Sequence, residues 1–168
     1  MSAEASKDFV IWRVFDATRQ RVWQAMTEAE RMKEWWPPKT VTIIAATMDL
    51  RPGGSFHCGV RTFEGFKMWA KFVYTEVVPP DHVTFVNSFS NAAGEVKRHP
   101  IVPTWPMETL TTVKLEDEPG SKTKMTVIWS AHNATDTERS TFDVSHVGMK
   151  ATWSGTFDRL AEYLAKAI

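Results

Sequence analysis

The chain has 168 residues, a length that suits one domain built around one hydrophobic core. Its 20 basic and 20 acidic residues cancel, and no Lys/Arg cluster occurs, which argues against a nucleic-acid partner. No apolar run approaches the roughly 18 residues of a membrane span. Residues 1–8 lack the apolar segment of a signal peptide and are expected to be flexible. We therefore expect a single cytoplasmic domain, residues 1–168.

The first third of the chain predicts a strand followed by two short helices. Residues 9–15 are rich in β-branched and aromatic side chains, which favour a strand. Residues 19–27 place their apolar side chains on one helical face. Residues 28–36 form a second short amphipathic helix, which Pro37 and Pro38 end.

Six further strands follow, separated by short turns that suit an antiparallel sheet. They are residues 41–48, 55–61, 66–78, 82–89, 107–116 and 124–131. Strict alternation places Met68 and Phe72 on one face of their strand, and Phe85 and Asn87 on one face of theirs. Between the fourth and fifth of these strands, residues 90–106 form a long loop, which is either a lid or simply mobile.

A long amphipathic helix, from about residue 141 to residue 167, ends the chain. Trp153, Phe157, Leu160 and Leu164 recur at helical spacing and form one apolar stripe that faces the sheet. Gly148 either lets this helix pack closely or leaves space for a ligand. The element order predicts an α+β fold in which a seven-stranded curved antiparallel sheet is closed by the C-terminal helix.

A curved sheet closed by one helix encloses a space, and aromatic side chains converge on it from separate elements. These side chains either line a cavity for a small hydrophobic molecule or fill the space as core. The candidate ligand-binding residues are Met68, Phe72, Phe85, Trp129, Trp153, Phe157, His57 and Trp105. Trp105, in the long loop, either covers the cavity mouth or docks on the surface. His57 would hydrogen-bond a ligand if alternation turns it toward the cavity.

No metal ion or cofactor is expected. The single cysteine, Cys58, has no partner for a disulfide or for a cysteine-based zinc site. The five histidines occur in no His-x-Glu or His-Glu-x-x-His pattern. Nucleophile-elbow and phosphate-binding glycine motifs do not occur either.

Several segments, spread in order along the chain, together resemble one known family. They include Trp35-Trp36-Pro37-Pro38, the run Asp49–Gly54, and the run Trp153–Leu164. In these segments the chain is similar to the SRPBCC (START/Bet v-like) superfamily, in the branch named for the C-terminal domain of the activator of heat-shock-protein ATPase. The resemblance implies the helix-grip fold and a ligand cavity. It does not imply one activity, because the family is functionally diverse.

Three functions are compatible with these observations. The first is binding of a small hydrophobic ligand for transport, sequestration or sensing. The second is a cyclase- or hydrolase-type enzyme that uses the same cavity and one buried acid or base. The third is a protein-interaction domain similar to a co-chaperone. A homodimer formed through exposed sheet edges or aromatic patches is compatible with each of them.

Overall fold

The computed structural model describes residues 7–166, so residues 1–6 of the segment expected to be flexible lie outside the described part. Within these residues the chain folds into one sheet and four helices. In order, the elements are β1 (Phe9–Phe15), α1 (Arg19–Thr27), α2 (Ala29–Trp35), β2 (Val41–Met48), β3 (Ser55–Thr62), β4 (Lys67–Val78), β5 (His82–Ser90), β6 (Val96–Lys97), β7 (Glu108–Glu118), β8 (Lys122–His132), α3 (Asp136–Val144) and α4 (His146–Lys166).

The strands form an antiparallel sheet in the order β1-β8-β7-β5-β4-β3-β2. The expected seven-stranded sheet is thereby confirmed, and the two-residue strand β6 adds to it by pairing with β5 inside the long loop. The register shifts between Tyr74 and Glu76 in β4 and between Ile43 and Ala45 in β2. Such bulges bend a strand, which suits the curvature of the sheet.

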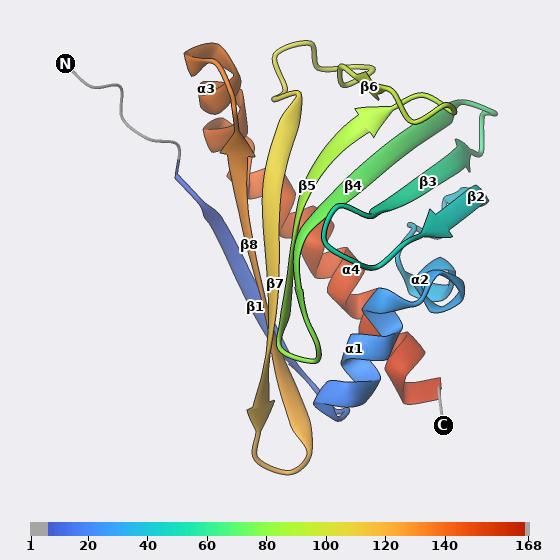
Figure 1. Cartoon of the computed structure of the whole chain (residues 1–168), viewed down its shortest axis with the longest axis vertical. Helices are drawn as coiled ribbons and strands as arrows, with labels where there is room; N and C mark the ends of the chain where they lie inside the picture. Colours follow the sequence, from blue (N-terminus) through green and yellow to red (C-terminus); the bar gives the residue numbers. More distant parts are fainter. Residues whose placement is uncertain (1–6, 167–168) are drawn as a thin grey trace.

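Figure 1 shows the sheet curving around α4, with α1 and α2 beside the lower half of that helix. Apolar side chains from both layers meet between them. Val127 of β8 and Leu160 of α4 have no exposed surface, and Phe56 of β3 and Phe157 of α4 are each 1% exposed. The predicted helix-grip arrangement, with the C-terminal helix on the concave face of the sheet, is therefore confirmed.

The C-terminal helical region differs from the expected single helix over residues 141–167. It begins earlier, at Asp136, and is divided at Ser145 into α3 and α4. The early start has a visible cause, because the Thr135 side chain accepts from the Glu138 backbone N–H while the Glu138 carboxylate accepts from the Thr135 N–H. This capping box satisfies two N–H groups that a helix start otherwise leaves unpaired.

Candidate ligand-binding cavity

A cavity of about 530 Å³ lies between the inner face of the sheet and α4. This volume is within the roughly 300–1,000 Å³ typical of small-molecule sites. Strands β4, β5, β7 and β8 form one side, and α4, the end of α2 and the long loop form the rest. The aromatic side chains that line it, apart from one imidazole, are Trp36, Phe72, Phe85, Phe89, Trp105, Trp129 and Trp153.

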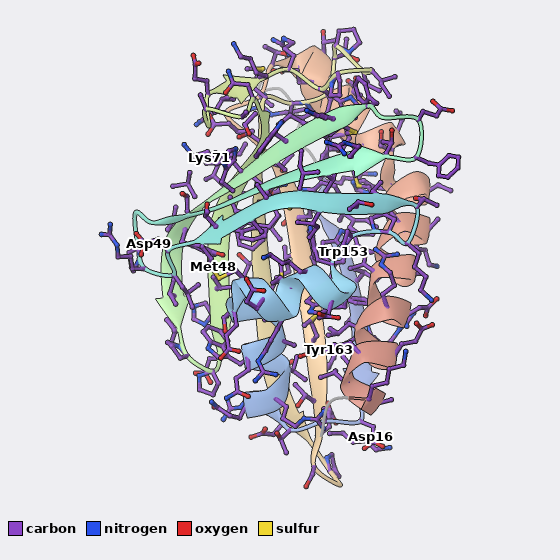
Figure 2. The ribbon with its side chains drawn as sticks, turned by 90° about the vertical axis from the view of Figure 1, so that its right-hand side faces the viewer. Asp16, Met48, Asp49, Lys71, Trp153 and Tyr163 are labelled. Carbon is purple, nitrogen blue, oxygen red and sulfur yellow. The ribbon has the colours of Figure 1, made fainter. Side chains whose placement is uncertain are left out.

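Four of these aromatic side chains form a wall on one side of the cavity. Phe72 stacks on Phe85 with ring centroids 4.5 Å apart, and Trp36 meets Phe72 and Trp153 edge-on at 5.8 and 5.7 Å. The same four residues also line a second cavity of about 40 Å³. Figure 2 shows Trp153 beside α4, in the space between that helix and the strands. The aromatic residues therefore fill part of the interior and leave the larger cavity open.

The segment before β7 covers another part of the cavity. Trp105 packs against Trp129 of β8 and Phe142 of α3, with both centroid distances 5.7 Å. Arg98 pairs with the Glu138 carboxylate at 2.9 Å, which ties the segment to α3. Backbone hydrogen bonds at Thr135 and the Arg98 guanidinium hold the pKa of Glu138 below its usual value. Trp105 thus lies over the cavity and is held by α3.

One amide is fixed on the sheet side of the cavity. The Asn87 side-chain oxygen accepts hydrogen bonds from the Thr109 and Thr111 hydroxyls at 2.7 and 3.0 Å. Both threonines are almost fully buried, at 1% and 2% exposed. With its oxygen occupied in this way, the NH₂ group is the remaining donor of the Asn87 amide, and Asn87 lines the cavity.

Small and polar residues of α4 and the Ser145 junction form the helix side of the cavity. They recur three or four residues apart and are Ser145, Gly148, Thr152, Thr156 and Arg159. The three hydroxyls bond to backbone carbonyls four residues earlier: Ser145 to Thr141 at 2.6 Å, Thr152 to Gly148 and Thr156 to Thr152 at 3.1 Å. Their donors are thus used within the helices. Apart from the adjoining residues and the nearby backbone of α4, no described atom lies within 4 Å of the position of a Cβ at Gly148.

Among the described residues of the lining, Arg159 is the one charged side chain. Its Nε donates to the Trp35 carbonyl, and its Nη2 donates to the Trp36 carbonyl and the Thr156 hydroxyl, all at 3.1 Å. These bonds tie the C-terminal end of α2 to α4. Partial burial lowers the pKa of Arg159 below its usual value, although Asp158 and Glu162 act in the opposite direction.

The other titratable side chain in the lining is His99. Its Nδ1 accepts from the backbone N–H groups of Ile101 and Val102, both at 3.0 Å, so this nitrogen is unprotonated. The ring lies 4.6 Å from that of Phe89, measured between centroids. Burial lowers the pKa of His99, which favours the neutral imidazole.

Five of the eight candidates from the sequence line the cavity, namely Phe72, Phe85, Trp105, Trp129 and Trp153. Phe157 does not, because its ring packs into the core against Phe15 at 5.6 Å. Met68 does not either. Met68 faces the same side of β4 as Ala70, which lines the cavity, but it lies two residues closer to the start of the strand, where it pairs with Val60.

His57 lies on the other face of the sheet. It is paired with Lys71, and neighbours in register share a face. Figure 2 shows Lys71 on the side of the sheet away from α4. The His57 ring stacks on Trp69 at 4.9 Å, and its Nε2 lies within hydrogen-bond distance of the Ser90 hydroxyl and the Asn91 carbonyl. His57 therefore does not face the cavity, as its choice as a candidate required, because Phe56 and Cys58 occupy the inner positions of β3.

Sequence reasoning did not include Trp36 or the small and polar residues of α4 among the candidates. Trp36 follows the last residue of α2 and still has helical backbone angles, but helical periodicity does not distinguish a side chain that lines a cavity from one that fills the core. The spacing of Gly148, Thr152 and Thr156 beside the apolar stripe was the available signal for the helix side of the cavity.

Two further findings concern metals and membranes. Within residues 7–166, no group of three His, Cys, Asp or Glu side chains is placed to hold a metal ion. The helices in this part of the chain are also too short or too polar to cross a membrane.

Cys58 of β3 is buried in the hydrophobic core, and burial raises the pKa of its thiol to about 11.

Comparison with known proteins identifies the family. Among curated proteins, none matches the chain. A solved structure from Arthrobacter aurescens is 25% identical, with a TM-score of 0.75, over 95% of this chain and 87% of that one. A protein from Nitrosomonas europaea is 24% identical, with a TM-score of 0.73, over 99% of both chains. One from Rhodobacter sphaeroides is 18% identical, with a TM-score of 0.77, over 99% and 97%. The sequence model of the Activator of Hsp90 ATPase homolog 1-like proteins matches residues 16–165, and the chain therefore belongs to that family.

Proposed function

We propose that this protein binds a small, largely apolar molecule in the cavity between the sheet and α4. The observation that carries the proposal is the open volume of about 530 Å³, which persists although seven aromatic side chains line it. When an apolar ligand displaces poorly hydrogen-bonded water from a space of this size, the change in free energy favours binding. The fold of this family commonly binds ligands, which supports the same conclusion.

The few polar groups of the cavity suit a role in orienting such a ligand. The hydroxyls of Thr152 and Thr156 donate to carbonyls of α4, so they do not require an acceptor from the ligand. The Asn87 NH₂ group is a fixed donor on the opposite side, because two buried threonines hold its amide oxygen. A mostly apolar lining with a few placed donors is the usual composition of a small-molecule site.

Binding explains the cavity better than acid–base catalysis does. A cyclase or hydrolase needs a titratable group that faces its substrate and exchanges a proton. Among the described residues, the titratable side chains in the lining are His99 and Arg159. The Nδ1 of His99 already accepts two backbone N–H groups, and a guanidinium does not give up its proton.

The test combines retained-ligand analysis with a blocking variant. Native mass spectrometry of protein purified from its own host would show a bound small molecule as added mass. Gly148→Phe places a ring in the open volume, whereas Gly148→Ala adds one methyl group and serves as the control. We expect the added mass in the wild type and in Gly148→Ala, and its loss in Gly148→Phe.

Calorimetric melting provides a second measurement with added ligands. A panel of uncharged aliphatic alcohols and aromatic hydrocarbons would raise the melting temperature of the wild type by mass action. At a free ligand concentration of 100 Kd, the added stability is about 2.7 kcal/mol. No shift across the panel, together with no retained mass, would refute the proposal.

The possible homodimer stays a prediction. The outer face of β1, at one edge of the sheet, exposes Val10 and Trp12 to 55% and 57%. Size-exclusion chromatography with light scattering measures the molar mass directly, and a monomer at all concentrations would contradict the expectation.

A further inference from the structure

We propose that the ligand is an amphiphilic monoanion whose carboxylate is bound by Arg159. This inference rests on the proposed function, because it names the chemical class of the molecule that the same cavity holds. It follows from the charge, the partners and the position of one side chain.

Arg159 has hydrogen-bonding capacity that the protein does not use. A guanidinium has five N–H groups. Three of them donate, one from Nε to Trp35 and two from Nη2 to Trp36 and Thr156. Among the described residues, no acceptor bonds to the two N–H groups of Nη1. Nη1 lies beside Gly155, 3.4 Å from the position that a Cβ would take there. Because Arg159 lines the cavity, these two donors are available to a ligand oxygen that reaches the guanidinium.

Arg159 also makes no direct ion pair within residues 7–166, although Asp158 and Glu162 favour its charged form from a longer distance. The acidic side chains nearest in sequence on α4 are Asp158 and Glu162, and each pairs elsewhere. Asp158 accepts from Arg13 at 2.6 Å, and Glu162 accepts from Lys39 at 3.1 Å. All the acceptors that Arg159 does contact are neutral, two carbonyls and one hydroxyl.

The rest of the cavity favours a single negative charge on the ligand. No Asp, Glu or Lys side chain belongs to the described lining, so Arg159 supplies its one formal charge. Partly burying a cation without a direct ion-pair partner costs free energy, and a bound anion offsets that cost. One positive charge matches a carboxylate better than a phosphate dianion, whose second charge would find no partner here.

The guanidinium is held in place before a ligand arrives. Its bonds to Trp35 and Trp36 fix it against the end of α2, and the bond to Thr156 fixes it against α4. A donor group already held in one orientation loses little conformational entropy on binding. The aromatic wall that includes Trp36 and Trp153 lies beside it, ready to contact an apolar chain.

The experiment compares three probes with the same ten-carbon chain and different head groups: decanoate, 1-decanol and decylammonium. Titration calorimetry at neutral pH measures Kd for the wild type, Arg159→Gln and Arg159→Lys. A charge-assisted hydrogen bond in a partly buried site is worth about a factor of ten or more in affinity. We expect the wild type to bind decanoate at least about tenfold more tightly than decylammonium.

The variants separate charge recognition from the anchoring of α2. In Arg159→Gln, the ratio of the decanol Kd to the decanoate Kd should fall about tenfold, and Arg159→Lys should restore part of it. Decanol binding shows that each variant retains a folded cavity. An unchanged ratio in Arg159→Gln would overturn the inference and leave Arg159 as an anchor only.

The wild type alone also tests the inference, in case a variant fails to fold. Equal affinity for decanoate and decylammonium would overturn it while leaving the proposed function intact, because both probes would still bind. If none of the three probes binds, this inference fails, and the retained-mass and melting measurements described above then decide the proposed function.

Discussion

Replacing Gly148 by alanine should stabilise the protein without closing the cavity. Glycine inside a helix costs about 0.5–1 kcal/mol relative to alanine, because the unfolded chain has more conformational freedom to lose. The usual reason to keep a glycine, close approach of another group, does not apply here. Apart from the adjoining residues and the nearby helix backbone, no described atom lies within 4 Å of the position of a Cβ at Gly148.

The expected gain is therefore about 0.5–1 kcal/mol in the free energy of unfolding. For a domain of this size, each kcal/mol raises the melting temperature by about 2–4 °C. Urea denaturation followed by far-UV circular dichroism measures the free energy, and the midpoint should rise with an unchanged slope. The gain lies near the lower end of the range if the first turn of α4 frays.

Two other glycines provide matched controls. Gly155→Ala adds a Cβ in ordinary contact with Arg159, 3.4 Å from Nη1, outside the cavity lining, and should give a similar gain. Gly59→Ala would place a Cβ 2.7 Å from the Trp69 ring and should cost about 1–3 kcal/mol through overpacking. A destabilised Gly148→Ala beside a stabilised Gly155→Ala would refute the open space at Gly148.

Three further predictions concern buried polar and titratable groups. Asn87→Leu removes the side-chain oxygen that accepts from the Thr109 and Thr111 hydroxyls, and urea denaturation should show a loss of about 1–3 kcal/mol; no loss would contradict the fixed amide. Burial lowers the pKa of His99 in the folded protein. The stability that the neutral imidazole contributes is therefore complete above the unfolded pKa of about 6.5. It is lost as the pH falls from there toward the lower folded pKa. His99→Asn should reduce that slope, and an identical slope would exclude His99 as its source. The pKa of about 11 for Cys58 predicts slow reaction with a thiol reagent at pH near 8 in the native protein and fast reaction in urea; fast native reaction would contradict the burial.

Alternation and helical periodicity were sufficient for most of the fold. The inner positions of β4, β5 and β8 follow from their patterns, and Phe72, Phe85 and Trp129 accordingly line the cavity. His57 shows the limit of this reasoning, because alternation relates neighbours to each other but does not say which set faces inward. On β3 the inward set is Phe56 and Cys58.

The helix side of the cavity was harder to predict for a different reason. A helix that crosses a curved sheet meets it along only part of its length, and sequence periodicity does not give the crossing angle. Trp153 and Phe157 belong to one apolar stripe, yet Trp153 lines the cavity and Phe157 packs in the core. No proline or glycine at Ser145 signals the division between α3 and α4. The capping box of Thr135 and Glu138 was a sequence signal for the start of α3.

The distribution of tryptophan has a spectroscopic consequence. The chain has eight tryptophans, and Trp36, Trp105, Trp129 and Trp153 line the cavity. Their indole rings come from the C-terminal end of α2, the long loop, β8 and α4, so they surround the space from several directions. An occupant that displaces water or quenches an excited ring therefore alters intrinsic emission without any added label. The protein thus carries its own optical reporter of occupancy, and replacing these four tryptophans one at a time by phenylalanine would show where each occupant lies.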